Sequence, residues 1–289
     1  MEFLYGNIIA TLPEKLVPRE LWPEYDRKSV VLRFCNPEYV GINPVGVRWS
    51  LWPLCFEAYI SDTEPDMQQS DLSHTARNRV VMWNQISRSR AVPGWYRLSK
   101  RPATIEGYAV VEPEYWLRWS ESARRARKKW LTSYANNKYR IRLGSFAEFE
   151  KAYNKSTVAR STLRESIRVT RQLEEHSPAI MRYLLVERIS NGEIKAGLSL
   201  VESDSTKNTY YAAGFYHKDV EDEPLMVALM DEWFKSSLDR GYLFLHFGQF
   251  WHTGESRSWK GFSTFKSKFG LFYYAFPPTM WRFARGKLY

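Results

Sequence analysis

The spacing of apolar residues becomes regular shortly after Pro113. Trp116, Trp119, Ala123 and Trp130 recur at intervals of three, four and seven residues, which places them on one face of a helix. The positions between them are strongly basic. We therefore predict an amphipathic helix whose exposed face carries Arg124, Arg125, Arg127, Lys128 and Lys129.

Helical and strand patterns alternate from there to the end of the chain. Asn191-Gly192 separates two apolar runs, as in a β-hairpin. The clearest helical stripe begins at Pro224, which suits a first turn, and stops at Gly241. Besides that helix, we predict helices over Ser145–Lys155 and Thr157–Glu174, and strands over Tyr183–Ile189, Ile194–Val201, Thr209–Phe215, Tyr242–Gly248 and Leu271–Phe276.

The first part of the chain has a different pattern, rich in Pro and Trp and poor in helical periodicity. We place a boundary near Val111–Glu114 and predict two domains, a strand-rich lobe over residues 1–114 and an α/β domain over residues 115–289. Within the lobe we predict strands in Ser29–Phe34 and Val45–Ile60, a surface loop at Ser61–Ser73, a helix at His74–Ser89 and a loop-and-turn region at Arg90–Gly107.

Composition indicates a globular protein that binds a polyanion. Hydrophobic residues make up 44% of the chain and aromatic residues 16%, which is ample core material. The net charge of +10 favours nucleic acid, a nucleotide-linked sugar, coenzyme A or an anionic membrane face. No apolar run approaches the ~18 residues of a membrane span, and the N-terminus lacks a signal-peptide pattern. We expect a cytoplasmic protein, with membrane-surface contact left open.

Several reaction classes lack their motifs. The chain has no Walker loop, no strand-linked GxGxxG, no His-Glu-x-x-His and no Gly-x-Ser-x-Gly. The histidines are scattered, and Cys35 and Cys55 follow no metal-ligand or redox spacing. We therefore expect neither a metal site nor a serine nucleophile.

The segment Gly261–Gly270 (GFSTFKSKFG) carries the most informative pattern. Its lysines lie among phenylalanines, and glycines bound it. This composition suits a loop that holds a cation against a partly apolar site, where the charge neutralises an oxyanion or a phosphate. A helix and a strand ending in Phe247-Gly248 precede it. The whole order, with its Phe-Lys-x-x-Phe-Gly motif, resembles the second half of the Fem-type aminoacyltransferases.

The resemblance implies a fold class. Helices, a β-meander, a long helix, a strand, a short loop or helix and a last strand follow the layout of a GNAT acyltransferase domain. We therefore expect an α/β, GNAT-type acyltransferase fold, with a mixed central sheet flanked by helices. It is Fem-like, with an abbreviated N-terminal lobe that one interpretation takes as a degenerate GNAT half.

The resemblance also implies roles for residues. Lys266 would stabilise the negative charge that develops during acyl transfer, or grip the donor's terminal ribose and phosphate. His246 stands where Fem-like proteins commonly have an acidic residue, and an imidazole can act as base or proton shuttle. Glu202 and Asp204 are the nearest carboxylate candidates for a base. The implied sites are Lys266, Phe265 and His246 for catalysis; Arg124, Arg125, Arg127 and Lys268 for the donor or its phosphate; and Tyr211, Gly214, Phe215 and Gln249 for the cleft.

The residues before the long helix bear on the donor. GNAT enzymes that use acetyl-coenzyme A hold its pyrophosphate on backbone amides at this helix N-terminus. Here Lys218–Pro224 (KDVEDEP) has four carboxylates, which repel a pyrophosphate, and a proline, which removes an amide donor. We therefore favour aminoacyl-tRNA as co-substrate, with no tightly bound cofactor. An acyl-coenzyme A or acyl-carrier donor is the alternative.

The predicted reaction is the transfer of an acyl or aminoacyl group to an amine, forming an amide bond. The acceptor would be a peptidoglycan precursor or a peptide. Such a reaction needs positioning and oxyanion stabilisation more than a covalent nucleophile. A hypothesis of another class stays open: a catalytically silent GNAT-like module that binds RNA or a protein partner.

Overall fold

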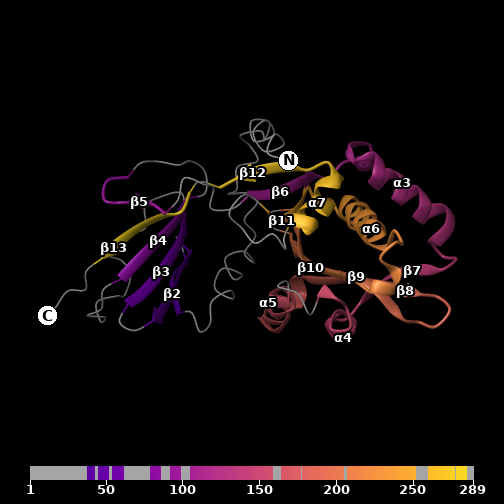
Figure 1. The fold of residues 1–289 in the computed structure, drawn as a ribbon, viewed down its shortest axis with the longest axis horizontal. Coiled ribbons are helices and arrows are strands. Elements are labelled where there is room, and N and C mark those ends of the chain that lie inside the picture. Colours follow the sequence, from indigo (N-terminus) through magenta and orange to yellow (C-terminus); the bar gives the residue numbers. More distant parts are fainter. Residues whose placement is uncertain are drawn as a thin grey trace. The chain divides into compact units, whose positions relative to one another are not determined.

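The computed structural model describes residues 38–42, 45–51, 54–61, 79–85, 92–98, 105–158, 164–176, 178–204, 207–251, 260–276 and 278–284. Contacts within the chain divide it into two compact units (Figure 1). The first combines residues 1–106 with residues 274–289, and the second is residues 107–273. The second unit is therefore continuous in sequence, whereas the first is built from two separate segments.

The first unit has a six-stranded sheet in the order β1-β2-β3-β4-β13-β5. Its strands are β1 (Glu38–Ile42), β2 (Val45–Leu51), β3 (Leu54–Ser61), β4 (Arg79–Gln85), β13 (Met280–Ala284) and β5 (Tyr96–Arg97). β3 and β4 run parallel, and the other neighbouring pairs are antiparallel. A small core of Val81, Trp83, Trp95 and Met280 packs on it.

Sequence expectations for this unit are only partly met. The strands in Val45–Ile60 are confirmed as β2 and β3. The helix predicted over His74–Ser89 is wrong, because β4 occupies its centre and buries Val81 and Trp83 with a period of two. Arg90–Gly107 contains β5 and the start of β6, so it is not only loop and turn. The predictions for Ser29–Phe34 and for Ser61–Ser73 beyond Ser61 lie outside the described residues.

The second unit has a seven-stranded sheet in the order β12-β6-β11-β10-β9-β8-β7. The strands are β6 (Ile105–Val110), β7 (Tyr139–Gly144), β8 (Met181–Arg188), β9 (Ile194–Ser203), β10 (Asn208–Tyr216), β11 (Phe244–Phe250) and β12 (Phe272–Ala275). β7 to β10 form an antiparallel meander, and β11 pairs parallel with β10. The predicted strands of this region are thereby confirmed.

Helices lie on both faces of this sheet (Figure 1). One face carries α4 (Phe146–Tyr153) and α5 (Arg164–His176), and the other carries α6 (Leu225–Asp239) with α3 (Glu121–Lys129) and α7 (Lys260–Lys266). Local signals explain their starts: Ser120 caps α3, and Ser145 with Glu148 forms a capping box at α4. No helix in the described ranges is long and apolar enough to span a membrane.

The helices predicted in the second unit are confirmed with shifted bounds. The amphipathic helix after Pro113 is a 3₁₀ turn at Tyr115–Arg118, then α3, then a π-helical turn at Trp130–Tyr134. Of the short loop or helix expected before the last strand, the helix is confirmed, because α7 and a 3₁₀ turn at Ser267–Phe269 fill Gly261–Gly270. Gly261 lies in the first turn of α7, and a side-chain Cβ at this position would have no atom within 4 Å.

Candidate functional site

The site forms where β10 and β11 part. The two strands pair in parallel over only three positions, ending at Tyr210 and His246. Two residues further along β11, Gly248 takes a left-handed conformation with φ 70°. That conformation suits glycine and interrupts the regular strand geometry. β10 continues to Tyr216 and stays paired with β9, so beyond Tyr210 its other edge is no longer paired with β11.

A β-bulge in β10 reorients the side chains beside this opening. The register with β9 jumps from Tyr211 opposite Leu200 to Ala213 opposite Ser199, which leaves Ala212 as the extra residue. Before the bulge, Thr209 accepts a hydrogen bond from the indole of Trp233 on α6. After it, Ala213 and Phe215 pack into the core beneath α4 and α5. Tyr211 therefore ends the set of side chains that face α6.

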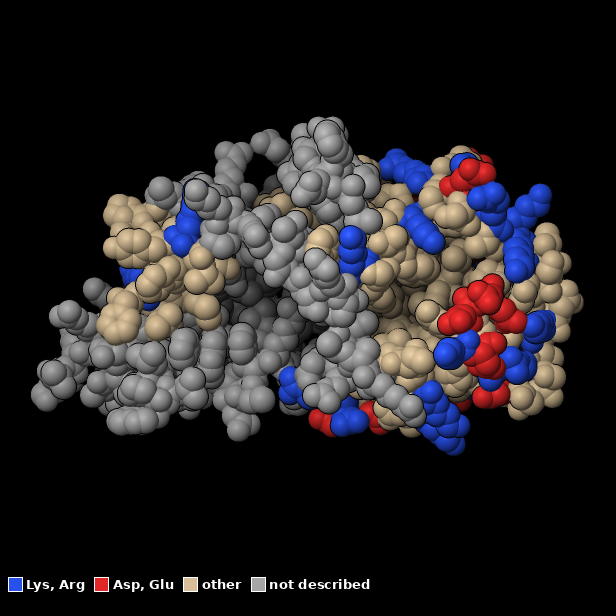
Figure 2. All heavy atoms as spheres, viewed as in Figure 1, with Lys and Arg blue, Asp and Glu red and all other residues tan. Residues whose placement is uncertain are grey.

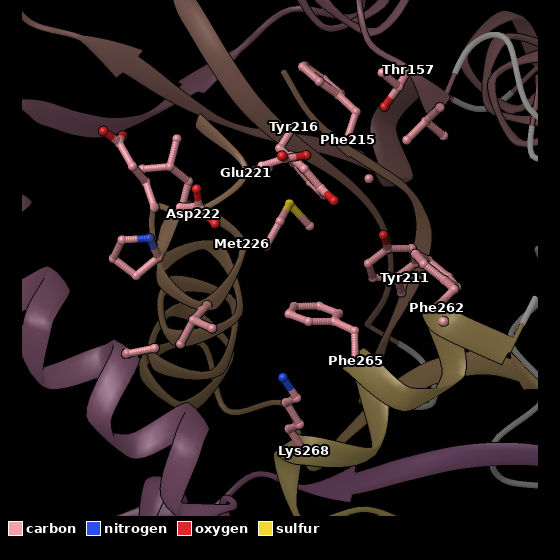
Figure 3. A pocket seen from close by; sticks show the side chains of 18 of the residues that line it. Thr157, Tyr211, Phe215, Tyr216, Glu221, Asp222, Met226, Phe262, Phe265 and Lys268 are labelled. Carbon is pink, nitrogen blue, oxygen red and sulfur yellow. The ribbon is translucent and has the colours of Figure 1, made fainter. Parts of the chain in front are cut away.

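A cavity of about 680 Å³ opens beside these residues, and Figure 3 shows the side chains that surround it. Its walls come from β10, the segment before α6, the first turn of α6, the end of α3 and the α7 segment. Much of the lining is apolar, including Met226, Phe262 and Phe265. A volume and lining of this kind are typical of a small-molecule site.

The two ends of the cavity carry opposite charge. Glu221, Asp222 and Glu223 line it at the α6 N-terminus, and Lys268 lines it just after α7. Lys129 also lines it, and its ammonium lies over the ring of Tyr134 together with that of Lys138, the partner of Glu223. Glu223 forms an ion pair with Lys138, whereas no ion pair is found for Glu221, Asp222 or Lys268 among the described residues. Figure 2 shows acidic side chains gathered on one part of this unit, with lysines and arginines around them.

Lys266, the strongest sequence candidate, is buried rather than displayed in the cavity. Only 3% of its surface is exposed, and its ammonium donates a hydrogen bond to the carbonyl oxygen of Phe247 on β11. The same ammonium lies over the rings of Phe262, at 4.4 Å, and Tyr211, at 4.8 Å. Both rings line the cavity, so Lys266 lies directly behind its wall.

The rest of the Phe-Lys-x-x-Phe-Gly motif divides into cavity and core. Phe265 and Lys268 line the cavity, and Figure 3 shows both side chains at the same end of it. Phe269 is 1% exposed and packs on Trp119, with ring centroids 5.0 Å apart. Gly270 has φ 66°, and a side chain there would lie 2.7 Å from the carbonyl oxygen of Arg118. The motif thus also joins α7 to the start of α3.

Tyr211 combines a cavity position with a buried hydroxyl. The residue is 4% exposed, and its hydroxyl is sealed from water with no hydrogen-bond partner among the described residues. Burial raises the pKa of this phenol, with a smaller contribution from Tyr153, so the proton stays on the oxygen at neutral pH. The neighbouring Gly214 makes room, since a Cβ at that position would overlap the hydroxyl.

Two predicted residues of β11 lie away from the cavity wall. His246 is 2% exposed and stacks on Tyr108, with centroids 4.4 Å apart and Tyr210 edge-on at 4.5 Å. Gln249 is half-buried in the same strand. Of the carboxylate candidates, Glu202 pairs with Arg182 and Arg240, and Asp204 accepts a hydrogen bond from Tyr242. None of these four side chains lines the cavity.

The predicted basic residues of α3 have different environments. Arg124 is exposed, and Arg125 is exposed with only a 3.6 Å ion pair to Glu121. Arg127 is turned inward: its Nε lies 2.5 Å from the carboxylate of Asp231 on α6, and its guanidinium lies 4.2 Å from the ring centroid of Trp116. Tyr115 donates to the same carboxylate, and burial next to it raises the pKa of that phenol. Arg127 therefore joins two helices.

Sequence reasoning missed part of the lining. Glu221 and Asp222 entered it only as residues that repel a pyrophosphate, while Lys129 and Met226 were assigned to helical faces. The run of carboxylates before Pro224 is the signal that identifies the acidic end. Within the described ranges, no group of three or more His, Cys, Asp or Glu side chains is arranged to hold a metal ion.

Comparison with solved structures defines the fold. FemX matches with a TM-score of 0.61 at 10% identity, over 99% of this chain and 96% of that one. L-PGS from Bacillus licheniformis matches with a TM-score of 0.52 at 11% identity, over 82% of this chain and 80% of that one. The C-terminal domain of a protein assigned as a lysylphosphatidylglycerol synthetase, from Agrobacterium fabrum, matches with a TM-score of 0.52 at 12% identity, over 91% of this chain and 88% of that one.

The chain therefore has an α/β fold like that of FemX. No protein-family model matches the sequence, and a search of curated proteins gave no match. With identities near a tenth, the likeness lies in the arrangement of elements.

Proposed function

We propose that this protein is an acyltransferase that forms an amide bond, taking an aminoacyl group from an ester donor and passing it to an amine. The observation that carries the proposal is the cavity at the parting of β10 and β11, with Tyr211, Phe265 and Lys268 in its wall and Lys266 behind it. It occurs in a fold shared with FemX, and the motif that builds it resembles that of Fem-type aminoacyltransferases.

The reaction asks for the kind of site that this cavity provides. An amine attacks the carbonyl carbon of an ester, negative charge develops on the carbonyl oxygen, and the leaving alcohol departs. Catalysis then rests on holding the two reactants together and on stabilising that oxygen. A buried ammonium behind an aromatic wall supplies positive potential where little water screens it. In this proposal Lys266 acts by its charge and by fixing Tyr211 and Phe262.

The charged ends of the cavity support an aminoacyl donor. Glu221 and Asp222 attract the ammonium of an amino acid or of an amine acceptor, and they repel the pyrophosphate of coenzyme A. Lys268 at the other end suits the terminal phosphate of a nucleic-acid donor. Arg124 and Arg125, exposed on α3, would bind phosphates along the backbone of tRNA. Aminoacyl-tRNA as the donor, and hence a cytoplasmic site of action, belongs to the proposal.

The acceptor in this proposal is an amine on a peptide or on a peptidoglycan precursor. It would approach from the acidic end of the cavity, where Glu221 and Asp222 are exposed. An amine must lose its proton before attack, and these carboxylates accept hydrogen bonds from it as it arrives. A catalytically silent module would have the same fold and could share the binding steps, so transfer itself must be measured.

The test mixes the purified chain with tRNA charged with a radiolabelled amino acid and with a panel of amine acceptors. Parallel reactions contain acetyl-coenzyme A or uncharged tRNA. Label in an amide product, dependent on charged tRNA, is the expected result. Product formed only from acetyl-coenzyme A would overturn the donor assignment. Salt-sensitive tRNA binding without product from any acceptor would favour the silent module.

A further inference from the structure

The buried hydroxyl of Tyr211 has no hydrogen-bond partner in the part of the chain that the structure describes. A buried phenol normally finds one, because leaving such a group unpaired costs about 1–3 kcal/mol. Here the oxygen is sealed from water and has no hydrogen-bond partner among the described residues. Its ring lines the cavity (Figure 3), so a ligand that enters the cavity and shifts the side chains over this oxygen can pair with it.

The surroundings of Tyr211 hold the ring in one place. Phe262 packs edge-on with its centroid 5.5 Å away, and Trp233 lies at 6.3 Å on the side of α6. The ammonium of Lys266 lies 4.8 Å from the ring centroid. A cation over the ring draws electron density from the phenol, which makes its O–H a stronger hydrogen-bond donor. Gly214 leaves the space that the hydroxyl occupies.

We propose that Tyr211 is a catalytic residue whose O–H donates a hydrogen bond to the carbonyl oxygen of the donor as that oxygen becomes negative. The proposal rests on the acyl-transfer function proposed above. The amine nitrogen forms a bond to the carbonyl carbon, and the carbonyl electron pair moves to the oxygen held by Tyr211. The ester C–O bond then breaks, and the proton lost by the amine passes to the leaving oxygen. Tyr211 keeps its own proton throughout.

The main test is Tyr211→Phe in the full chain. This change keeps the ring against Phe262 and Lys266 and removes only the hydroxyl. Loss of one oxyanion donor lowers kcat by about 10²–10³-fold, and we expect a fall of that size with KM nearly unchanged. The matched control is Tyr183→Phe, which removes another tyrosine hydroxyl of the unit. Tyr183 is buried and does not line the cavity, and its hydroxyl donates a hydrogen bond to Glu174 over 2.8 Å. Its kcat should stay within a few-fold of wild type.

A second variant tests the geometry without touching the phenol. Gly214→Ala places a methyl group where the hydroxyl now lies, so it should also lower kcat. In the Tyr211→Phe background the same change should have a smaller effect, because the closest atom is gone and only the ring carbon Cζ, 2.9 Å from the new methyl group, must shift. Full additivity of the two losses would count against a shared cause. Circular dichroism and thermal unfolding check that each variant is folded.

Donors with different leaving groups distinguish the carbonyl oxygen from the leaving oxygen. A hydrogen bond to the carbonyl oxygen predicts equal loss in Tyr211→Phe for aminoacyl esters of weakly and strongly acidic alcohols. A loss confined to the poorer leaving group would overturn the assignment and move the bond to the leaving oxygen. If wild type transfers and Tyr211→Phe transfers equally well, this inference fails alone. If wild type transfers from no donor, the proposed function fails with it.

Discussion

Two cationic segments of the second unit lie in opposite environments. On α3, the side chains of Arg125 and its partner Glu121 are each 74% exposed. In the α7 segment, Lys266 is 3% exposed and its ammonium is held by a carbonyl and aromatic rings. Exposed charges act through water, are screened beyond about 8 Å at physiological salt and can replace one another. A buried charge acts at short range and depends on each neighbour. In the proposed function, the exposed arginines attract the tRNA, whereas the buried lysine acts on the acyl group.

The largest effect is expected at the buried end of this comparison. Lys266→Met removes the charge but fills similar volume, so the fold should remain and its stability should be unchanged or increased. Transfer should fall by at least about 10²-fold, as when an electrostatic group is removed from a catalytic site. Lys266→Arg should not restore activity, because a planar guanidinium does not fit the same enclosure. Lys260→Met, at an exposed lysine of the same helix, is the control. Undiminished turnover in Lys266→Met would remove this residue from the mechanism.

Arg127 differs from the exposed arginines of α3, so its substitution should have a different effect. Its ion pair with Asp231 is largely buried, with the side chains 21% and 12% exposed. Arg127→Ala leaves that carboxylate with Tyr115 as its remaining partner and should lower the free energy of unfolding by about 3 kcal/mol. Arg124→Ala should change it by less than about 0.5 kcal/mol. Urea unfolding of both variants checks the difference, and equal stabilities would contradict the structural role of Arg127.

Lys268 lies between the two classes, half-buried and in the cavity wall. Lys268→Ala should weaken donor binding by about tenfold, the order expected for a charge-assisted hydrogen bond, with a smaller change in kcat. Tryptophan fluorescence titration with charged tRNA measures the affinity, with Lys260→Ala as the control. A loss confined to kcat would mean that Lys268 acts on the reacting atoms instead.

The exposed arginines should produce a smaller, salt-dependent effect. Neutralising Arg124 and Arg125 together should reduce tRNA affinity a few-fold. The slope of log affinity against log salt should fall by about one for each phosphate that the protein no longer neutralises. Lys151→Ala with Lys155→Ala makes the charge-matched control, since these exposed lysines lie at α4 on the other face of the sheet. Equal reductions from both pairs would show that net charge alone attracts the polyanion.

The smallest effect concerns an exposed charge with a fixed geometry. Arg142 and the Ser145 backbone amide lower the pKa of Glu148 from 4.5 to about 2. Because the folded pKa lies below the unfolded one, this carboxylate stabilises the fold above pH 4.5, and the contribution is lost as the pH falls towards 2. Its side chain is 42% exposed, so the difference from Glu148→Gln should stay below about 1 kcal/mol. Thermal unfolding of both proteins from pH 7 to pH 2 should show the two curves converge; a constant gap would contradict the linkage.

Much of the second unit could be predicted from sequence because its signals are local. The capping box of α4, the helical stripe of α6 and the Asn191-Gly192 turn each specify one element. The apolar run at β4 misled because Val80–Trp83 fits helix and strand alike, and pairing with β3 and β13 decides it. That pairing joins residues far apart in the chain.

The sequence was enough to predict which residues form the candidate site, but not which of them are buried. The motif at Gly261–Gly270 identified Phe265, Lys266 and Lys268 as a group, yet nothing local shows that Lys266 binds the carbonyl of Phe247, 19 residues away. Likewise Tyr211 is one tyrosine of an apolar strand until the bulge at Ala212 fixes which face it joins. These features depend on backbone irregularities, which short sequence patterns do not encode.

The position of β13 has a consequence for the order in which the chain is made. This strand lies between β4 and β5 in the first sheet, yet the whole second unit precedes it in sequence. A ribosome therefore releases everything needed for the second unit before it supplies the strand that completes the first. Until then, β4 presents an open edge, which is the kind of surface that pairs with other chains. Nascent chains halted before Met280 should therefore be prone to aggregate through the open edge of β4, although β1 to β5 were synthesised long before.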